Sequence, residues 1–215
     1  MLSWKGIIDQ LNNQYNKSDD LILELVNYQY GYIGWCLENR HKEEAIDYLR
    51  LAEENVKLLE AEKINHSLLC GYKAAFFGYH IALNKFLAPF YGPRSTNCAK
   101  QAVEVAPDQF FGYIQLGNVK FHTPALMGGS KTEAIGYYLT AKAMMEKRKE
   151  GNIGDWNYLS LLMTLARAYE STNNSAKAKL MYDEILNYEP EFKLVKEVLY
   201  PQLLKKGPQN NENGK

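Results

Sequence analysis

The long tracts between the seven prolines carry apolar residues at spacings of three and four rather than in alternation. This period places apolar side chains on one face of an α-helix, whereas a strand needs a period of two. The sequence therefore predicts an all-α protein with about ten helices. The expected helices cover residues 3–15, 19–38, 41–62, 64–87, 95–105, 107–121, 130–148, 155–171, 174–188 and 190–204.

Three of these helix starts carry residues suited to N-capping. Ser130 and Glu133 have the S-x-x-E spacing of a capping box, in which the hydroxyl and the carboxylate each accept a hydrogen bond from an amide of the first turn. Asp155 and Ser95 are candidates for the simpler single cap. The segments before these residues are therefore predicted to be turns or loops.

Ten helices joined by short turns suggest helical pairs, and an internal repeat supports this interpretation. One segment has the pattern L-x2-L-A-x2-Y-x8-A-x3-Y-x2-I-x4-P, formed by Leu162, Leu165, Ala166, Tyr169, Ala178, Tyr182, Ile185 and Pro190. Ala166 and Ala178 are small where two helices of one hairpin would cross closely, and the large residues would fill the space between hairpins.

A second, less regular copy precedes this one. It consists of Tyr113, Leu116 and Gly117, followed by Ala134, Tyr138 and Ala141, with an insertion over residues 122–129 between its two helices. Fainter copies lie earlier in the chain, around Ala45 and Ala52 and around Ala99 and Ala102. The spacing of the anchors is uneven, which predicts a degenerate array with lengthened helices and loops.

With these motifs the chain resembles the tetratricopeptide repeat (TPR) family over residues 20–192. The resemblance implies an α-solenoid of antiparallel helix hairpins, a TPR-like right-handed superhelix whose first helices line a concave face. The spacings GGS-x3-AI and WNYL are similar to those of bacterial exported or solute-transport-associated repeat proteins.

The array predicts a single domain over residues 1–204. Its repeat-like hairpins are expected near 20–62, 64–106, 107–148 and 155–189, with a capping helix over 190–204. Residues 205–215 contain almost nothing to bury and are predicted to be a disordered tail.

Charge and composition exclude several partners. Lys and Arg number 25, as do Asp and Glu, so the chain lacks the excess of positive charge that non-specific nucleic-acid binding needs. The longest uncharged stretch, 25–37, is well short of the roughly 20 apolar residues of a membrane span, so no membrane insertion is expected. No secretory leader is evident, which fits the cytoplasm for the chain as given and the periplasm for a chain whose leader was removed. Location therefore stays open.

No familiar catalytic motif is present, and the histidines at 41, 66, 80 and 122 are interpreted as having no ligand-type partner one helical turn away. The three cysteines at 36, 70 and 98 are too far apart for a CxxC pair and are expected to be free thiols. We therefore expect no catalytic residues, no metal site and no cofactor. The segment 128–132 (GGSKT) is interpreted as a turn before a capped helix, with anion binding at that helix end as the alternative.

Two aromatic stripes are candidate binding elements. Tyr28, Tyr32 and Trp35 lie at i, i+4 and i+7, and Tyr72, Phe76, Tyr79 and Leu83 repeat the stripe on a later helix. The stripes are predicted either to face each other across a groove or to pack between hairpins. Polar residues beside them are further candidates: Asn27, His80, Asn84, Asn118 and His122.

Two predicted loops, 88–94 and 122–129, would edge or close the groove. Arg94 is a candidate for binding a carboxylate, or else for an ion pair at the surface. In the second loop Leu126 and Met127 offer apolar contact, and Gly128 and Gly129 would let the backbone approach a ligand. The alternative is a loop that covers the apolar seam to the previous hairpin.

The candidate binding residues are thus Tyr28, Tyr32, Trp35, Tyr72, Phe76, His80, Asn84, Arg94, Asn118, His122, Met127, Gly128 and Gly129. Three functions are considered. The first is a non-catalytic scaffold that binds a protein or peptide through the concave face. The second is a small-ligand-binding accessory protein of a bacterial transport system, with the groove closed by the loops. The third is an enzyme or enzyme subunit, for which the groove would offer only His80, His122 and Arg94.

Overall fold

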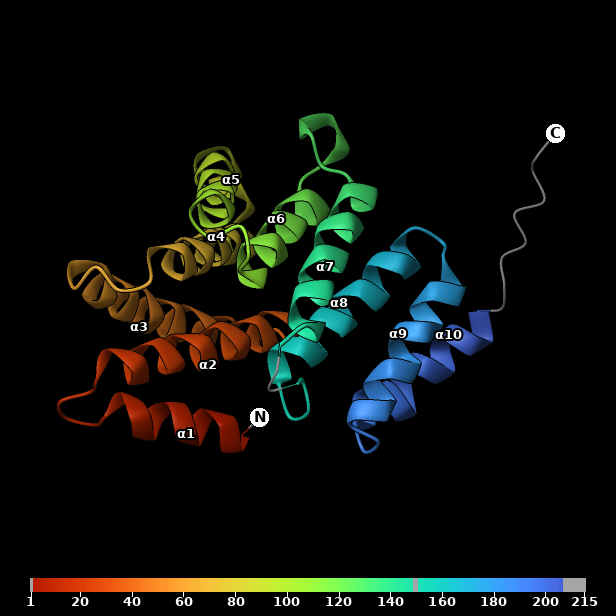
Figure 1. Cartoon of the computed structure of the whole chain (residues 1–215), viewed down its shortest axis with the longest axis horizontal. Coiled ribbons are helices and arrows are strands. Elements are labelled where there is room, and N and C mark those ends of the chain that lie inside the picture. Colours follow the sequence, from red (N-terminus) through yellow and green to blue (C-terminus); the bar gives the residue numbers. More distant parts are fainter. Residues whose placement is uncertain (1, 149–150, 207–215) are drawn as a thin grey trace. The chain divides into compact units, whose positions relative to one another are not determined.

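The computed structural model describes residues 2–148 and 151–206, and within these ranges every regular element is a helix (Figure 1). The chain divides into two compact units, Met1–Pro107 and Asp108–Lys215. Each is built from antiparallel helical hairpins, which confirms the predicted fold class. The single-domain organisation and the superhelix of the whole chain stay predictions. None of the helices in the described ranges is both long and apolar enough to cross a bilayer.

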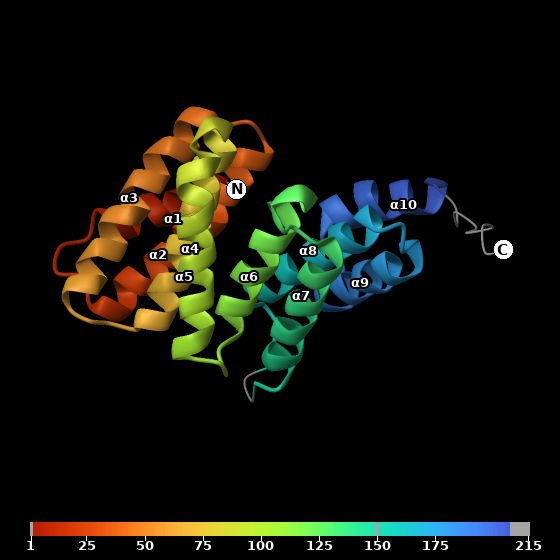
Figure 2. The ribbon, with the colours of Figure 1, turned by 90° about the horizontal axis from the view of Figure 1, so that it is seen from above.

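Over residues 2–107, the first unit contains five α-helices and one short 3-10 helix. These are α1 (Leu2–Asn12), α2 (Asp19–Glu38), α3 (Lys42–Ala61), α4 (His66–Leu83), η1 (Lys85–Leu87) and α5 (Ala88–Val105). Helix α2 packs on α1, α3 and α4, and α4 packs on α3 and α5 (Figure 2).

Local sequence accounts for the bounds of α2. The hydroxyl of Ser18 accepts a hydrogen bond from the amide of Leu21 (3.3 Å), and Asp19 and Asp20 complement the positive end of the helix dipole. The chain leaves the helix through Arg40, whose φ of 64° is left-handed. The observed range is the predicted one, because cap and periodicity agree here.

Helix α5 begins at Ala88, so the predicted loop 88–94 is wrong. Pro89 lies at the start of the helix, where a missing amide hydrogen is harmless, and Pro93 lies inside it. Ser95 is a buried helical residue rather than a cap, and its hydroxyl donates to the carbonyl of Ala74 on α4 (2.8 Å). Packing between α4 and α5 has overridden the local helix-breaking signal.

One polar pair lies in the core of the first unit. The side-chain amide of Asn55 on α3 donates to the Oε1 atom of Gln29 on α2 (3.1 Å), and Gln29 is fully buried. The Nε2 group of Gln29 has no hydrogen-bond partner in the described part of the chain. A buried donor in this state costs stability.

Over residues 108–148 and 151–206, the second unit contains five α-helices and two short elements. These are α6 (Phe110–His122), η2 (Ala125–Met127), α7 (Lys131–Glu146), α8 (Trp156–Ser171), α9 (Ser175–Tyr188), the π-helical η3 (Leu194–Leu199) and α10 (Tyr200–Lys206). Helices α6 and α7 pack together, as do α8 and α9, and α7 packs on α8.

The hairpin of α8 and α9 confirms the repeat pattern read from residues 162–190. Its seven apolar and small positions from Leu162 to Ile185 are all buried, and Ala166 and Ala178 are fully so. The carboxylate of Asp155 accepts a hydrogen bond from the amide of Asn157 (2.9 Å), as predicted for a cap. Pattern and packing therefore agree in this hairpin.

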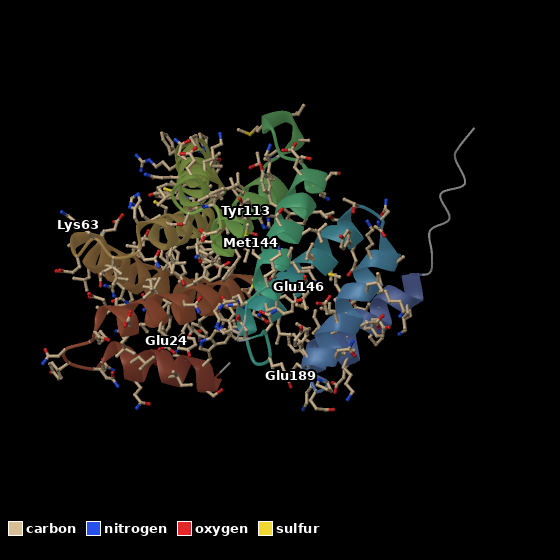
Figure 3. The ribbon with its side chains drawn as sticks, in the orientation of Figure 1. Glu24, Lys63, Tyr113, Met144, Glu146 and Glu189 are labelled. Carbon is tan, nitrogen blue, oxygen red and sulfur yellow. The ribbon has the colours of Figure 1, made fainter. Side chains whose placement is uncertain are left out.

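A polar network joins α7, α8 and α9. The hydroxyl of the buried Tyr158 donates its one proton to the carboxylate of Glu184 (2.5 Å) and lies 3.1 Å from that of Glu146 (Figure 3 labels Glu146). Lys142 pairs with the same two carboxylates. Burial, and then the carboxylate of Glu184, raises the pKa of the Tyr158 hydroxyl. The network therefore keeps a neutral phenol as a donor between two negative charges.

The last helix is irregular where the sequence predicted a regular one. A π-helical segment, Leu194–Leu199, leads into α10, which carries Pro201 in its first turn. Proline cannot donate the usual bond, and a π-bulge is one way to accommodate this. Helix α10 extends to Lys206, two residues past the predicted end, and the predicted disordered tail otherwise lies outside the described residues.

Candidate functional site

The aromatic residues predicted on α2 face α1 and α3. The hydroxyl of Tyr28 donates to Glu24 (2.9 Å; Figure 3 labels Glu24), and its ring meets Trp4 edge-on. Tyr32 is 3% exposed and lies between the rings of Trp35 and Tyr48, with centroid distances of 5.8 and 4.9 Å. Tyr28 thus packs against α1, and Tyr32 packs inside the hairpin formed by α2 and α3.

The stripe on α4 packs against a different face of α2. The Tyr30 ring contacts the rings of Tyr72 and Tyr79, both at 5.9 Å, and Tyr72 stacks on Phe76. The hydroxyl of Tyr72 donates to Asn27 (3.1 Å), and that of Tyr79 to the carbonyl of Tyr30 (3.0 Å). Burial raises the pKa of both hydroxyls. Of the two predicted arrangements, a groove between the stripes is therefore wrong, and the stripe on α4 packs against the neighbouring hairpin through α2.

Tyr30 is not among the predicted binding residues, although the sequence carries a signal for its contact with α4. Asn27, Tyr30 and Gly34 share one helical face at spacings of three and four. A Cβ atom at Gly34 would lie 3.2 Å from the Tyr79 hydroxyl, so the glycine makes room for the ring from α4. Tyr72 and Phe76, at 3% and 1% exposure, are core residues of this contact.

His80 and Arg94 meet at one ring, that of Tyr91 on α5. His80 stacks on Tyr91 (5.1 Å), and its Nε2 atom lies 2.8 Å from the carboxylate of Glu53 on α3. The Arg94 guanidinium lies 5.8 Å from the Tyr91 centroid, and Phe77 stacks on the same ring. His80 therefore links three helices.

Two exposed rings lie near the start of α5, Phe86 in η1 and Phe90 in the first turn of α5. Asn84 accepts a hydrogen bond from the amide of Phe86 (3.1 Å) and so caps η1. Phe86 is 90% exposed and Phe90 is 70% exposed. Asn84 thus has a structural role, and the exposed rings nearby were not predicted.

In the second unit Asn118 holds a buried tyrosine. The hydroxyl of Tyr138 on α7 donates to Asn118 Oδ1 (2.8 Å), and the Asn118 amide donates to Gln115 (3.1 Å). The Tyr138 ring passes over Gly117, where an added Cβ would lie 2.3 Å from Tyr138 Cε1. Asn118 is therefore engaged in the α6–α7 crossing.

The predicted loop over residues 122–129 is present and is closed by its own hydrogen bonds. The carbonyl of Pro124 accepts bonds from the amides of Met127 (2.9 Å) and Gly129 (3.1 Å). The ammonium group of Lys120 on α6 donates to the carbonyl of Gly128 (3.2 Å). The backbone of the loop is thus held as a compact turn.

The two glycines serve this turn. Gly128 has a φ of 89°, which is left-handed, and a Cβ at Gly129 would lie 1.8 Å from the carbonyl oxygen of Thr123. The next residue, Ser130, accepts a hydrogen bond from the amide of Glu133 (3.2 Å), and the Glu133 carboxylate pairs with Lys120 (2.7 Å). Only half of the predicted capping box is therefore formed, and the glycines have a reason to be present without a ligand.

The tip of the loop consists of Leu126 and Met127, 103% and 69% exposed. His122, also exposed, ends α6 and meets Phe121 edge-on at 5.0 Å. Two apolar side chains stand in solvent on a turn whose backbone is fixed.

The interpretation that no histidine has a ligand-type partner one helical turn away is wrong for His66. Cys70 follows His66 by one helical turn, and its Sγ atom lies 3.6 Å from His66 Nε2. Cys36, Cys70 and Cys98 are free thiols, as predicted. Within residues 2–148 and 151–206 no three His, Cys, Asp or Glu side chains gather as a metal site would require.

Neither a family model nor a curated protein matches the chain. Among solved structures, it is similar to the crystal structure of a thermophilic TPR protein from Thermus thermophilus. The TM-score is 0.53 with 19% sequence identity, and the match covers 87% of this chain and 91% of the other. The likeness defines the class of fold, a TPR-like helical repeat, in agreement with the hairpins described above.

Proposed function

We propose that this protein is a non-catalytic scaffold that binds a partner protein, and that Leu126 and Met127 at the loop tip enter an apolar recess of that partner. The observation that carries the proposal is the exposure of these two side chains on a backbone held by Lys120 and by the turn itself. A fixed turn loses little conformational entropy on binding.

The free energy available from burying Leu126 and Met127 is large enough to support binding of a partner. Full burial of a leucine or methionine side chain contributes about 1.5–3 kcal/mol each. Methionine also adapts its shape to irregular recesses. The alternative, a loop that covers an apolar seam, does not account for side chains that remain exposed.

The alternative function, a small-ligand-binding protein with a groove closed by loops, is less well supported than before. That hypothesis needed two loops, and residues 88–94 belong to α5. Of the predicted binding residues, Tyr32, Tyr72 and Phe76 are buried in helix contacts. The binding role of His122, Met127 and the neighbouring glycines remains part of the proposal.

The test uses the double variant Leu126→Ser, Met127→Ser in affinity capture from an extract of the source organism. The matched control is Ile153→Ser, which removes another 89% exposed apolar side chain of the same unit. We expect the double variant to lose a protein that the parent and Ile153→Ser both retain, with an unchanged melting temperature. Purified partner would then give a Kd weaker by roughly 100-fold or more for the double variant, since the two burials together contribute at least about 3 kcal/mol and each 1.4 kcal/mol is tenfold. Equal capture by all three proteins would refute the role of the tip.

A further inference from the structure

The face of α5 that is turned away from α4 begins with an apolar stripe. In the first unit α5 packs on α4 and on η1 (Figure 2). Pro89, Phe90 and Pro93 are exposed on α5, and their spacings of three and four residues place them on one face of the helix. Phe86 in η1 precedes Phe90 by four residues and is 90% exposed. The stripe therefore presents two phenylalanine rings and two prolines to solvent.

The packing of α5 on α4 does not need these rings. That contact is made by the opposite face, where Tyr91 stacks on Phe77 and the hydroxyl of Ser95 donates to the carbonyl of Ala74. An isolated exposed apolar side chain is ordinary, whereas several that adjoin mark an interaction site. Aromatic side chains in particular are enriched at protein interfaces. The stripe thus has the character of a surface that a partner covers.

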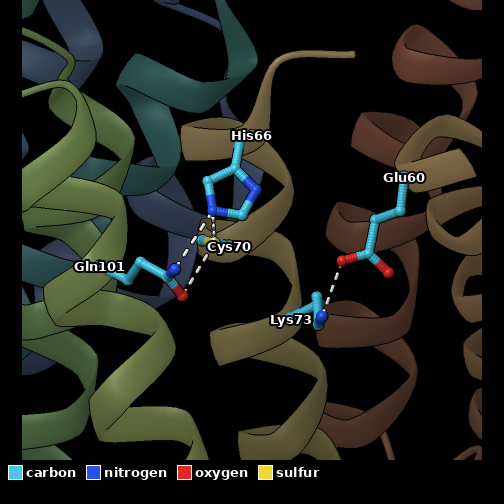
Figure 4. Close-up of polar contacts among 5 residues, drawn as sticks. All are labelled: Glu60, His66, Cys70, Lys73 and Gln101. Atoms are coloured by element: carbon cyan, nitrogen blue, oxygen red, sulfur yellow. Dashed lines mark hydrogen bonds and ion pairs between the residues drawn. The ribbon is translucent and has the colours of Figure 1, made fainter. Parts of the chain in front are cut away.

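The charge around this stripe is positive. Residues 63–103, which include α4, η1 and most of α5, contain five Lys or Arg and no Asp or Glu. Lys73 is paired with Glu60 of α3 at 2.7 Å (Figure 4). Lys85 and Arg94, by contrast, have no carboxylate partner among the residues that the structure describes. Two cations without a counter-charge therefore flank the two rings, one before them and one after them in the chain.

The Arg94 guanidinium is held in place without being neutralised. It lies 5.8 Å from the centroid of the Tyr91 ring, which also stacks on His80 at 5.1 Å. The carboxylate of Glu53 is engaged by His80 Nε2 at 2.8 Å. A guanidinium can bind a carboxylate through two parallel hydrogen bonds, and one that is already ordered loses less entropy on doing so. Arg94 is therefore suited to a carboxylate that a partner supplies.

We propose that this stripe binds an acidic amphipathic helix of a partner protein. Apolar side chains of the partner cover Phe86 and Phe90, and its carboxylates pair with Lys85 and Arg94. A helix fits because an apolar face of period three and four lies well along another such face. The flanking charges then select acidic partners and set their orientation.

This surface is different from the one that carries the proposed function. It belongs to the first unit, whereas the loop tip of Leu126 and Met127 belongs to the second, so either surface can be tested without the other. It also lies on the second helix of its hairpin, whereas the resemblance to the TPR family implied binding by the first helices.

The small number of unpaired cations favours a protein partner over a membrane or a nucleic acid. Recognition of anionic lipid by a helix typically uses about 4–8 Lys or Arg side chains in one cluster. Non-specific binding to nucleic acid likewise depends on many phosphate contacts. The stripe has two unpaired cations, and the chain has no net charge. A few carboxylates on one peptide are enough to match this surface.

The experiment selects a random peptide library, displayed on phage, against the immobilised full chain. The most enriched peptide is then labelled with a fluorophore and titrated with the protein, with anisotropy as the measurement. We expect enriched peptides to combine large apolar residues at spacings of three and four with Asp or Glu. Their affinity should fall as the salt concentration rises, because the exposed charge pairs are screened.

Three variants make the assignment specific. The double variant Phe86→Ser, Phe90→Ser should weaken binding roughly tenfold or more, because it removes both rings from the contact. Arg94→Glu should weaken binding by a similar factor, and it should bind more tightly than the parent to a peptide in which Lys replaces each Asp and Glu. Lys42→Glu is the matched control, because it reverses an exposed cation on α3 and should leave the affinity unchanged. Circular dichroism checks that all three variants fold like the parent.

Several outcomes would overturn the proposal. They are no enrichment on the parent beyond that on the double variant, enriched peptides that are basic or uncharged, or an affinity that the double variant or Arg94→Glu leaves unchanged. Vesicles of phosphatidylcholine with phosphatidylserine, and a single-stranded oligonucleotide, test the other partners; binding of either that requires the two rings, without selection of acidic peptides, would refute a protein partner. Self-association that is seen by sedimentation and abolished in the double variant would instead assign the stripe to a second copy of this chain.

Discussion

Gly117→Ala is a sensitive test of the α6–α7 crossing. Alanine is the better helix former by about 1 kcal/mol, so a glycine inside a helix is normally replaced with a gain. Here the new Cβ would lie 2.3 Å from Cε1, 2.5 Å from Cδ1 and 2.9 Å from Cζ of Tyr138. Tyr138 is fully buried and bonded through its hydroxyl to Asn118 (2.8 Å), so its ring cannot yield without loss.

The magnitude follows from three contributions. Overpacking costs about 1–3 kcal/mol, and loss of the Tyr138 hydrogen bond costs about 1 kcal/mol. The gain in helix propensity offsets about 1 kcal/mol of this. We therefore expect Gly117→Ala to lower the free energy of unfolding by about 1–3 kcal/mol, measured by urea denaturation followed by circular dichroism at the helical band.

Gly136→Ala on α7 is the matched control. No atom lies within 4 Å of its ideal Cβ position, so it should raise the free energy of unfolding by about 0.5–1 kcal/mol. Opposite signs for the same chemical change would isolate the contact with Tyr138. The reasoning is refuted if Gly117→Ala is as stable as the parent, or if both substitutions shift stability in the same direction.

Three further predictions concern other parts of the core. Ala166→Leu adds three heavy atoms at a fully buried position and should cost about 1–3 kcal/mol; a melting temperature within a degree of the parent would contradict the tight α8–α9 crossing. Replacing Gln29 and Asn55 together with leucine should be neutral or stabilising, because it removes a buried donor that lacks a partner, whereas Asn55→Leu alone should destabilise; urea titrations of both variants decide this. A thiol reagent at pH 8 should modify the partly exposed Cys98 in the native protein, and Cys36 only after unfolding, since burial raises the pKa of Cys36 to about 11; mass spectrometry of labelled peptides would reveal the reverse order.

The helices themselves were largely predictable. The range of α2 was predicted to the residue, and α8 and α9 to within one residue, because a strong N-cap and a regular apolar period are both local signals. The small residues of the repeat pattern also predicted which positions lie at the α8–α9 crossing. These features depend on residues a few positions apart.

The beginning of α5 was not predictable in this way. Pro89, Gly92 and Pro93 signal a loop when considered by themselves. Contacts with α4, such as the stack of Tyr91 on Phe77, outweigh that signal, and they join residues more than ten positions apart. Propensity is a weak preference that tertiary packing overrides.

The sequence alone thus determined an all-α chain of hairpins, since a period of three and four residues admits one kind of element and small residues mark close crossings. Only the tertiary structure decided what each helix face meets. It placed Tyr30, rather than Tyr28 or Tyr32, against α4, left Leu126 in solvent, and brought Gln101 to the Cys70 thiol. The physical reason is that the residues of a helix determine which of its faces is apolar. Which other helix covers that face depends on how side chains distant in sequence pack together.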